Sequence, residues 1–164
     1  MEKERIKTMI KVRELKNKDI QQMINLYSEF LKDQSDKNKY YHISYAPFCK
    51  KTQYYENMIK SEHGKIFIGE DAGTLVGCMA VLKRTPDFLF EFDSYAYLCD
   101  GFVKENYRIS KLSFHLYEAC EQWAKENNCK YLAAYAYASN KKAQIGFQAK
   151  KLDPYKICLL YTSP

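Results

Sequence analysis

A single carboxylate interrupts an otherwise apolar stretch near the middle of the chain. Asp100 lies within the stretch 95–103, three residues before Val103. An unpaired carboxylate is costly to bury, so Asp100 is either functional or salt-bridged, and the sequence leaves both interpretations open. Gly101 follows it, and a glycine inside a strand often marks a β-bulge or a close approach of two backbones.

A second candidate is an anion site at the start of a helix. Residues 112–124 place apolar side chains at helical spacing and predict a helix over about 110–127. Backbone N–H groups at the start of a helix attract anions. Lys111 adds a cation there, while Ser110 and Ser113 add hydroxyl groups. The alternative is that Ser110 only caps a surface helix and that Lys111 is solvated.

The remaining residues that can do chemistry give weaker signals. His115 lies between apolar residues of the predicted helix, where a packed or partly exposed histidine is more common than a catalytic one. His42 lies in an aromatic segment without a visible partner. The cysteines have neither the C-x-x-C spacing nor the nearby histidines of a metal site, so we expect reduced thiols and no metal. These cysteines are Cys49, Cys78, Cys99, Cys120, Cys129 and Cys158.

The composition is that of one globular domain spanning residues 1–164, with 46% hydrophobic and 28% charged residues. The net charge of +6 is spread over short runs, which favours anionic partners in general and argues against a nucleic-acid role. No apolar stretch reaches the roughly 18–20 residues of a membrane helix. Met1–Lys7 lack the apolar stretch of a secretory signal. We therefore expect a cytoplasmic protein that does not bind membranes.

The periodicity of apolar residues predicts the elements that must position these groups. Strands are expected at 9–13, 66–68, 75–82, 95–103, 131–137 and 154–160. Helices are expected from an N-cap at Asn17 to about 32, and over 51–62, 110–127 and 140–147. Asp71–Gly73 predicts a tight hairpin turn. Phe88–Phe92 either extends a hairpin or lines a groove.

The expected order, β-α-α-β-β-β-α-β-α-β, resembles the GNAT N-acetyltransferase fold, an α/β (α+β) fold with a mixed, mostly antiparallel sheet flanked by helices. Lys65–Gly77 resembles the family's second and third strands, and Leu98–Arg108 resembles its fourth strand and the approach to its cofactor loop. Asn140, Ala143 and Phe147 have the spacing of the family's Asn…Ala…Tyr signature. The resemblance covers most of the chain and is clearest over residues 65–147.

The resemblance implies acetyl-CoA as acyl donor. Splaying of the fourth and fifth strands would leave edge groups on Phe102 and Val103 that bind the pantetheine arm as a pseudo-strand, while the helix start binds the pyrophosphate. Asp100 would act as the base, often through water, and Asn140 would orient the thioester end. The implied cofactor-binding residues are Phe102, Val103, Arg108, Ile109, Ser110, Lys111, Leu112, Ser113 and Asn140.

Two departures from the family affect this interpretation. The family's loop reads Arg-Gly-x-Gly, whereas this chain has Ile109 and Lys111 at the glycine positions, and we expect them to restrict the loop or reshape it. Phe147 occupies the position of a tyrosine that protonates the leaving thiolate, and general-acid help is worth ~10²–10⁴ in rate. A hydroxyl from Tyr135 or Tyr137 on the neighbouring predicted strand would be a substitute, although a tyrosine is more often a packing residue.

The function implied is transfer of an acetyl group to the primary amine of a small molecule or of a protein N-terminus or lysine. The alternatives are a catalytically inactive GNAT-like module that binds CoA or a partner, and a basic domain that contacts nucleic acid. Tyr40–Phe48 either covers the acceptor site or completes a small core, and a homodimer is left open. Residues 158–164 resemble a reading frame that runs through into a sequencing adapter, so we expect a non-native tail there.

Overall fold

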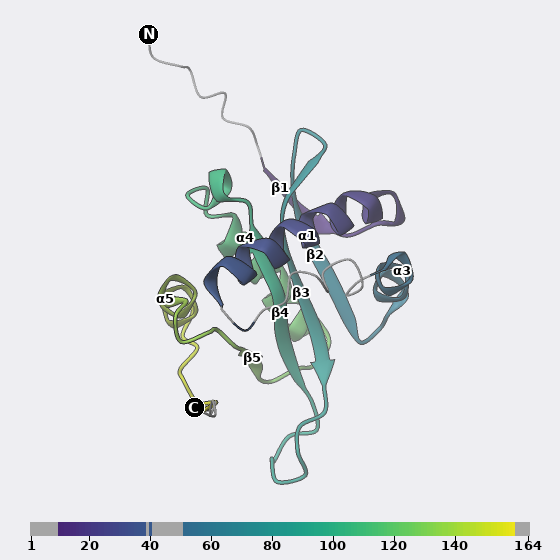
Figure 1. Cartoon of the computed structure of the whole chain (residues 1–164). Helices are drawn as coiled ribbons and strands as arrows, with labels where there is room; N and C mark the ends of the chain where they lie inside the picture. Colours follow the sequence, from purple (N-terminus) through teal and green to yellow (C-terminus); the bar gives the residue numbers. More distant parts are fainter. Residues whose placement is uncertain (1–9, 39, 41–50, 160–164) are drawn as a thin grey trace. The chain divides into compact units, whose positions relative to one another are not determined.

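Figure 1 presents a computed structural model of the chain, and the structure describes residues 10–38, 40 and 51–159. Contacts divide the chain into two compact units, Met1–Ala134 and Tyr135–Pro164, each taken here by itself. His42, Cys49 and all but Tyr40 of the proposed acceptor cover lie outside the described residues.

One five-stranded sheet organises the first unit, in the order β1-β2-β3-β4-β5. Neighbouring strands are antiparallel except β4 and β5, which are parallel, and α4 supplies the crossover that a parallel pair requires. The strands are β1 (Lys11–Glu14), β2 (Gly64–Asp71), β3 (Thr74–Arg84), β4 (Tyr95–Val103) and β5 (Leu132–Ala134). The helices are η1 (Asn17–Asp19), α1 (Ile20–Lys37), α3 (Thr52–Lys60), η3 (Glu105–Tyr107), α4 (Leu112–Glu126) and, in the second unit, α5 (Lys141–Ala149).

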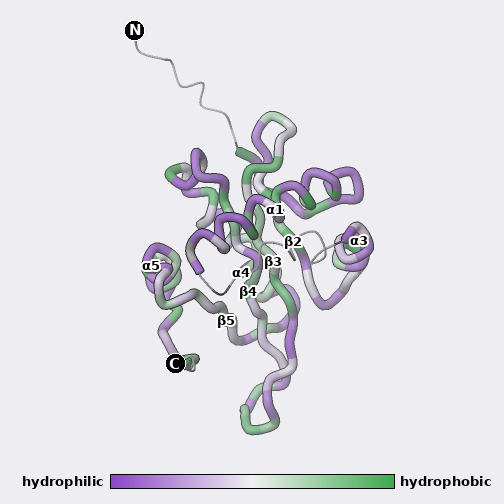
Figure 2. Tube along the Cα trace, viewed as in Figure 1, coloured by the Kyte–Doolittle hydropathy of each residue, from purple (hydrophilic) through white to green (hydrophobic). Residues whose placement is uncertain are grey.

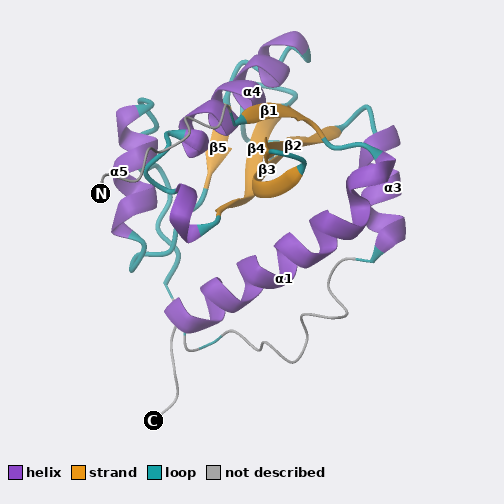
Figure 3. Ribbon diagram, turned by 90° about the horizontal axis from the view of Figure 1, so that it is seen from above, coloured by secondary structure: helices purple, strands orange, loops and turns teal. Residues whose placement is uncertain are grey.

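Helices cover both faces of this sheet, with α1 and α4 on opposite sides (Figure 3). This explains why β3 carries a nearly continuous apolar run from Leu75 to Val81 instead of an alternating one, because side chains on both of its faces are buried. The core on one face joins α1, α3 and the sheet, and its largest fully buried side chains are Met23, Leu26, Tyr55 and Ile68.

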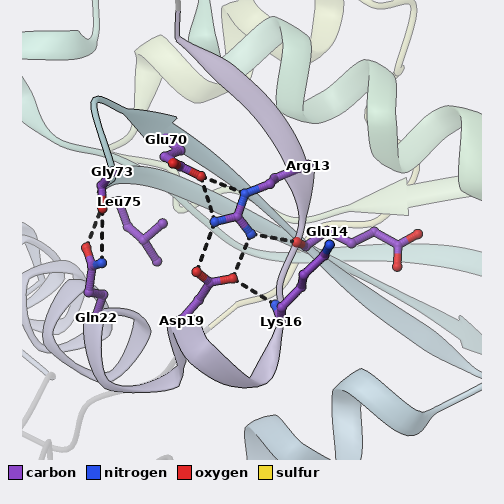
Figure 4. Close-up of polar contacts among 8 residues, drawn as sticks. All are labelled: Arg13, Glu14, Lys16, Asp19, Gln22, Glu70, Gly73 and Leu75. Atoms are coloured by element: carbon purple, nitrogen blue, oxygen red, sulfur yellow. Dashed lines mark hydrogen bonds and ion pairs between the residues drawn. The ribbon is translucent and has the colours of Figure 1, made fainter.

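A buried ion-pair network fixes the corner where β1, η1 and β2 meet (Figure 4). Arg13 donates two hydrogen bonds to the Asp19 carboxylate, at 2.6 and 2.9 Å, and one to Glu70 at 2.6 Å. Asp19 is only 3% exposed, and it also accepts the backbone N–H of Lys16. The hydrogen bonds from Arg13 hold the pKa of the Asp19 carboxyl below its usual value.

The hairpin turn between β2 and β3 lies where the sequence predicted it. Ala72 and Gly73 both have positive φ, 47° and 83°, which is the geometry of the two-residue hairpin turn that suits twisted strands. Gln22 of α1 holds this turn, because its side chain donates to the Gly73 carbonyl and accepts from the Leu75 N–H, both at 3.1 Å.

The long connection between β3 and β4 exposes three large apolar side chains at its tip. Phe88, Leu89 and Phe90 are 90%, 77% and 46% exposed, and the tip is coloured hydrophobic in Figure 2. Phe92 instead packs against the ring of Tyr131, with centroids 4.4 Å apart. The segment therefore forms the connection itself and does not lengthen either strand.

Four sequence predictions need correction. Asn17 is not an N-cap, because it lies inside η1, whose N-cap is Lys16, and the N-cap of α1 is Asp19. The helix expected to end near residue 32 continues to Lys37, because no glycine or proline interrupts residues 33–37. The strand expected over 131–137 pairs with β4 only over Leu132–Ala134. Residues 154–159 form no strand, because no described strand pairs with them and their side chains are exposed.

Candidate functional site

A β-bulge places the candidate base in a distorted part of β4. Cys78 pairs with Phe102 and Ala80 pairs with Cys99, so two residues of β4, Asp100 and Gly101, oppose the single residue between Cys78 and Ala80. Asp100 has a φ of 52°, a conformation that residues other than glycine rarely adopt. This confirms the bulge that Gly101 suggested, and bulges commonly redirect side chains near active sites.

The ladder between β4 and β5 is short. It contains three residue pairs and ends at Leu98 with Ala134, whereas β4 continues to Val103. The last five residues of β4 therefore run past the end of the described ladder on this edge, as the resemblance implied.

Of the two residues expected to offer edge groups, Val103 does so and Phe102 does not. In an antiparallel ladder, successive residues direct their backbone groups alternately toward the partner strand and away from it. Lys104 donates its N–H to the Val76 carbonyl at 2.9 Å, so the backbone groups of Phe102 face β3 and those of Val103 face the β5 edge. The Val103 carbonyl accepts a hydrogen bond from Arg108 Nε at 3.0 Å.

The loop from β4 to α4 is held by its own side chains. Tyr107 donates its hydroxyl to Asp71 at 2.7 Å, and this hydrogen bond raises the tyrosine pKa. Ser110 does not cap α4 but donates its hydroxyl to the Tyr107 carbonyl at 2.6 Å. Ile109 is 75% exposed and Lys111 is exposed as well, so neither of the residues that replace glycine packs into the protein.

Lys111 keeps the backbone conformation that glycine would supply. It is the N-cap of α4 and has φ 62° and ψ 9°, in the left-handed region. The next two residues, Leu112 and Ser113, donate their backbone N–H groups to no described acceptor, so both remain available at the positive end of the helix dipole. The altered loop therefore still leads into a helix start with two available backbone N–H groups, the kind of group to which anions bind.

Two paired glycines let the start of α4 approach the sheet. Gly69 and Gly77 lie opposite each other in β2 and β3, and Leu112, which is 1% exposed, packs over them. A Cβ on Gly69 would lie 2.6 Å from a methyl group of Leu112, and a Cβ on Gly77 would lie 3.0 Å from another. The sequence pattern predicted neither the pairing of these glycines nor the packing of Leu112 on them.

The other two candidate residues belong to the second unit. The side chain of Asn140 caps α5 by accepting the Ala143 N–H at 3.2 Å. Phe147 is half-buried in the same helix, and the Tyr135 and Tyr137 rings pack edge to face at 6.0 Å. Asn140 thus has a local structural role in addition to the one that the resemblance implies.

The other titratable groups that the structure describes form no second site. His115 is exposed and lies 3.3 Å from Glu118 on the same helix. Burial raises the pKa of the Cys120 thiol, and burial, followed by the nearby Glu121 charge, raises that of Tyr117 to about 12. Among the described residues, no group of three or more His, Cys, Asp or Glu side chains could hold a metal ion. A pocket of about 160 Å³ borders Leu15, Met58 and Ile66, and none of the candidate site residues lines it.

Residues 20–150 match the model of the acetyltransferase (GNAT) family. The chain belongs to this family. The match extends over the boundary between the two units, and the mixed sheet with helices on both faces is the GNAT fold.

Solved structures agree with this assignment. AAC(6′)-Iy in complex with a bisubstrate analogue, CoA-S-monomethyl-acetylneamine, shares 15% identity and a TM-score of 0.75, covering 96% of this chain and 99% of that one. A mutant of the BH1408 protein of Bacillus halodurans shares 12% identity and a TM-score of 0.80, covering 94% and 99%. The aminoglycoside acetyltransferase HMB0005 from an uncultured soil metagenomic sample shares 17% identity and a TM-score of 0.73, covering 95% and 98%. At these identities the similarity concerns the fold.

The search of curated proteins gave no significant match to the chain. Among the described helices, none combines the length and the apolar character that crossing a bilayer requires.

Proposed function

We propose that this GNAT protein transfers the acetyl group of acetyl-CoA to a primary amine. One observation carries the proposal. The edge of β4 beyond Leu98 leads through a single loop to the start of α4, where backbone N–H groups are available. The first suits an amide-bearing arm and the second suits a diphosphate. Together they fit a ligand that carries both groups.

Different residues of the chain would bind the pantetheine arm and the diphosphate of acetyl-CoA. Val103 would hydrogen-bond the pantetheine amides, and the backbone N–H groups of Leu112 and Ser113 would hold the diphosphate. Lys111 is exposed beside them and would add a cation. Acetyl-CoA supplies the electrophilic thioester carbon and a thiolate leaving group when bound.

Asp100 is the proposed base. It would take the proton that the amine loses as its nitrogen bonds to the acyl carbon, directly or through a water molecule. Its place in the bulge, at the edge of the strand that would bind the donor, supports this role. Asn140 is proposed to orient the thioester end.

The acceptor is proposed to be a small-molecule amine, with a protein amine as the second candidate. Support for the first comes from the structural neighbours that are aminoglycoside acetyltransferases, one of them in complex with a CoA–acetylneamine analogue. A panel that contains aminoglycosides, simple polyamines and lysine peptides distinguishes these acceptors.

Calorimetric titration with acetyl-CoA tests the proposal. We expect binding with a dissociation constant in the micromolar range and release of free thiol when an accepted amine is added. Absence of binding would contradict the proposal.

One observation favours a second candidate function, a non-catalytic module that binds CoA. Phe147 has no proton to donate to the leaving thiolate, and general-acid help is worth ~10²–10⁴ in rate. Binding of acetyl-CoA without thiol release for any amine of the panel would support the module instead of the enzyme.

Replacing Phe147 with tyrosine further distinguishes the enzyme from the non-catalytic module. We expect Phe147→Tyr to raise kcat roughly ten- to hundredfold, at or below the lower end of general-acid contributions because a thiolate leaves without much help. Phe88→Tyr, at an exposed phenylalanine, is the matched control and should leave kcat unchanged. An unchanged kcat in Phe147→Tyr would mean that the proton comes from another group or is not needed.

A further inference from the structure

Two carboxylates of α1 hold both ends of the short segment that leads into the cofactor loop. Glu29 and Asp33 are four residues apart and therefore lie on the same face of the helix. Glu29 Oε1 lies 2.8 Å from Lys104 Nζ, directly after β4, and Asp33 Oδ1 lies 2.9 Å from Arg108 Nη2, directly after η3.

Arg108 connects three parts of the first unit. Its Nη2 donates to Asp33 of α1, while its Nε donates to the carbonyl of Val103 at the end of β4. Its own backbone lies three residues before Lys111, the left-handed residue at the start of α4. The ion pair with Asp33 therefore fixes the loop relative to both the strand edge and the helix start.

These ion pairs are too exposed to contribute much to folding. The side chains of Lys104 and Glu29 are 30% and 50% exposed, and those of Arg108 and Asp33 are 38% and 21% exposed. Exposed pairs of this kind stabilise a fold by about 0–1 kcal/mol. Their arrangement, one at each end of a five-residue segment, constrains where that segment lies.

We infer that Glu29 and Asp33 are positioning residues for CoA binding. The inference rests on the proposed function. By fixing Lys104–Arg108 on α1, the two carboxylates hold the loop in the conformation that presents the N–H groups of Leu112 and Ser113 to a diphosphate. They restrain the loop from α1, and they touch neither the ligand nor the reacting atoms.

The experiment compares CoA binding by calorimetry in the whole chain and in three variants with the same change of charge. We expect Glu29→Gln and Asp33→Asn each to raise the dissociation constant of CoA, by roughly three- to fivefold. Asp36→Asn, at an exposed carboxylate of the same helix, controls for the lost negative charge and should not weaken binding. Asp33→Glu keeps the carboxylate and should restore most of the affinity.

A second readout separates positioning from general stability. Thermal unfolding of Glu29→Gln and Asp33→Asn should match that of Asp36→Asn. In turnover, KM for acetyl-CoA should rise while kcat stays unchanged, and kcat/KM for S-acetylpantetheine, which lacks the diphosphate, should not fall.

The outcomes distinguish this inference from the proposed function. If the unmodified chain does not bind CoA, both are overturned. If it binds CoA and both variants bind as Asp36→Asn does, the inference alone is overturned. Tighter binding by Asp33→Asn than by Asp36→Asn would also overturn it, because Asp33 would then compete with phosphate for Arg108.

Discussion

The corner around Arg13 and the loop around Arg108 both pair an arginine with a carboxylate, but in different surroundings. At the corner, Arg13 and Asp19 have side chains that are 16% and 5% exposed, and Arg13 binds two carboxylates. At the loop, Arg108 binds one carboxylate, Asp33, at 2.9 Å, and its side chain is 38% exposed. At the corner, loss of Asp19 would leave the mostly buried Arg13 paired with Glu70 alone, so this arrangement contributes more to the fold than an exposed ion pair does.

The second arrangement contributes little to the fold but determines where a loop lies. We therefore propose that the same pair of residue types stabilises the fold in one region and positions a loop for binding in the other. This difference predicts that substitutions at the corner will change stability and that substitutions at the loop will change binding.

The largest effect is expected at the corner. We expect Asp19→Ala to lower the free energy of unfolding by about 3 kcal/mol, because Arg13 loses two charge-assisted hydrogen bonds and the Lys16 N–H loses its acceptor. Asp87→Ala, at an exposed acid, should change it by less than about 0.5 kcal/mol. Urea unfolding measures both, and equal effects would contradict the structural role of Asp19.

The corner should also make stability depend on pH. Arg13 lowers the pKa of Asp19 in the folded state, so the pair stabilises the fold above the unfolded pKa, near 4. That contribution is lost as the pH falls through the lowered folded pKa. The difference in unfolding free energy between the unmodified chain and Asp19→Ala should be constant from about pH 7 to pH 5 and should shrink below about pH 4. A difference that grows in acid would contradict this assignment.

Where α4 meets the sheet, we expect a smaller effect on stability than at the corner and a larger effect on CoA binding. Gly69→Ala would place a Cβ 2.6 Å from Leu112, and such overpacking costs about 1–3 kcal/mol. Displacement of the helix start should also raise the dissociation constant of CoA. Gly146→Ala is the control, because nothing lies within 4 Å of the new Cβ, and it should stabilise α5 by about 0.5–1 kcal/mol.

The smallest effect is expected from relieving the left-handed backbone of the loop. Lys111→Gly should raise stability by about 0.5–1 kcal/mol, because a lysine at positive φ is strained and glycine is not. Lys151→Gly is the matched control, since Lys151 has φ 64° after α5. The melting temperature should rise in both variants. A gain at 151 alone would mean that Lys111 adopts another conformation in solution.

The sequence predicted the elements better than the contacts between them. The bounds of β4 and the turn at Ala72–Gly73 were confirmed, because apolar runs and turn residues act locally. The ion pairs of Arg13 were not predicted, since Asp19 and Glu70 resemble surface charges until the strands are paired. The length of β5 was wrong because the apolar pattern of 131–137 does not reveal where its partner strand ends.

The candidate site was predicted in outline and missed in its details. The helix start and the bulge followed from the pattern around Gly101 and Ser110. The left-handed Lys111 could not be predicted, because a lysine carries no signal for positive φ. The packing of Leu112 on Gly69 and Gly77 could not be predicted either, since it joins residues more than 30 positions apart.

The backbone of Asp100 has a consequence for any attempt to replace its carboxylate. At φ 52°, alanine would remove the acid and also introduce a residue that tolerates this conformation less well than aspartate or asparagine. A loss of activity in Asp100→Ala would therefore combine the loss of the carboxylate with a change in the backbone of the bulge. Asparagine accepts the left-handed conformation and keeps the shape of the side chain, so Asp100→Asn isolates the charge.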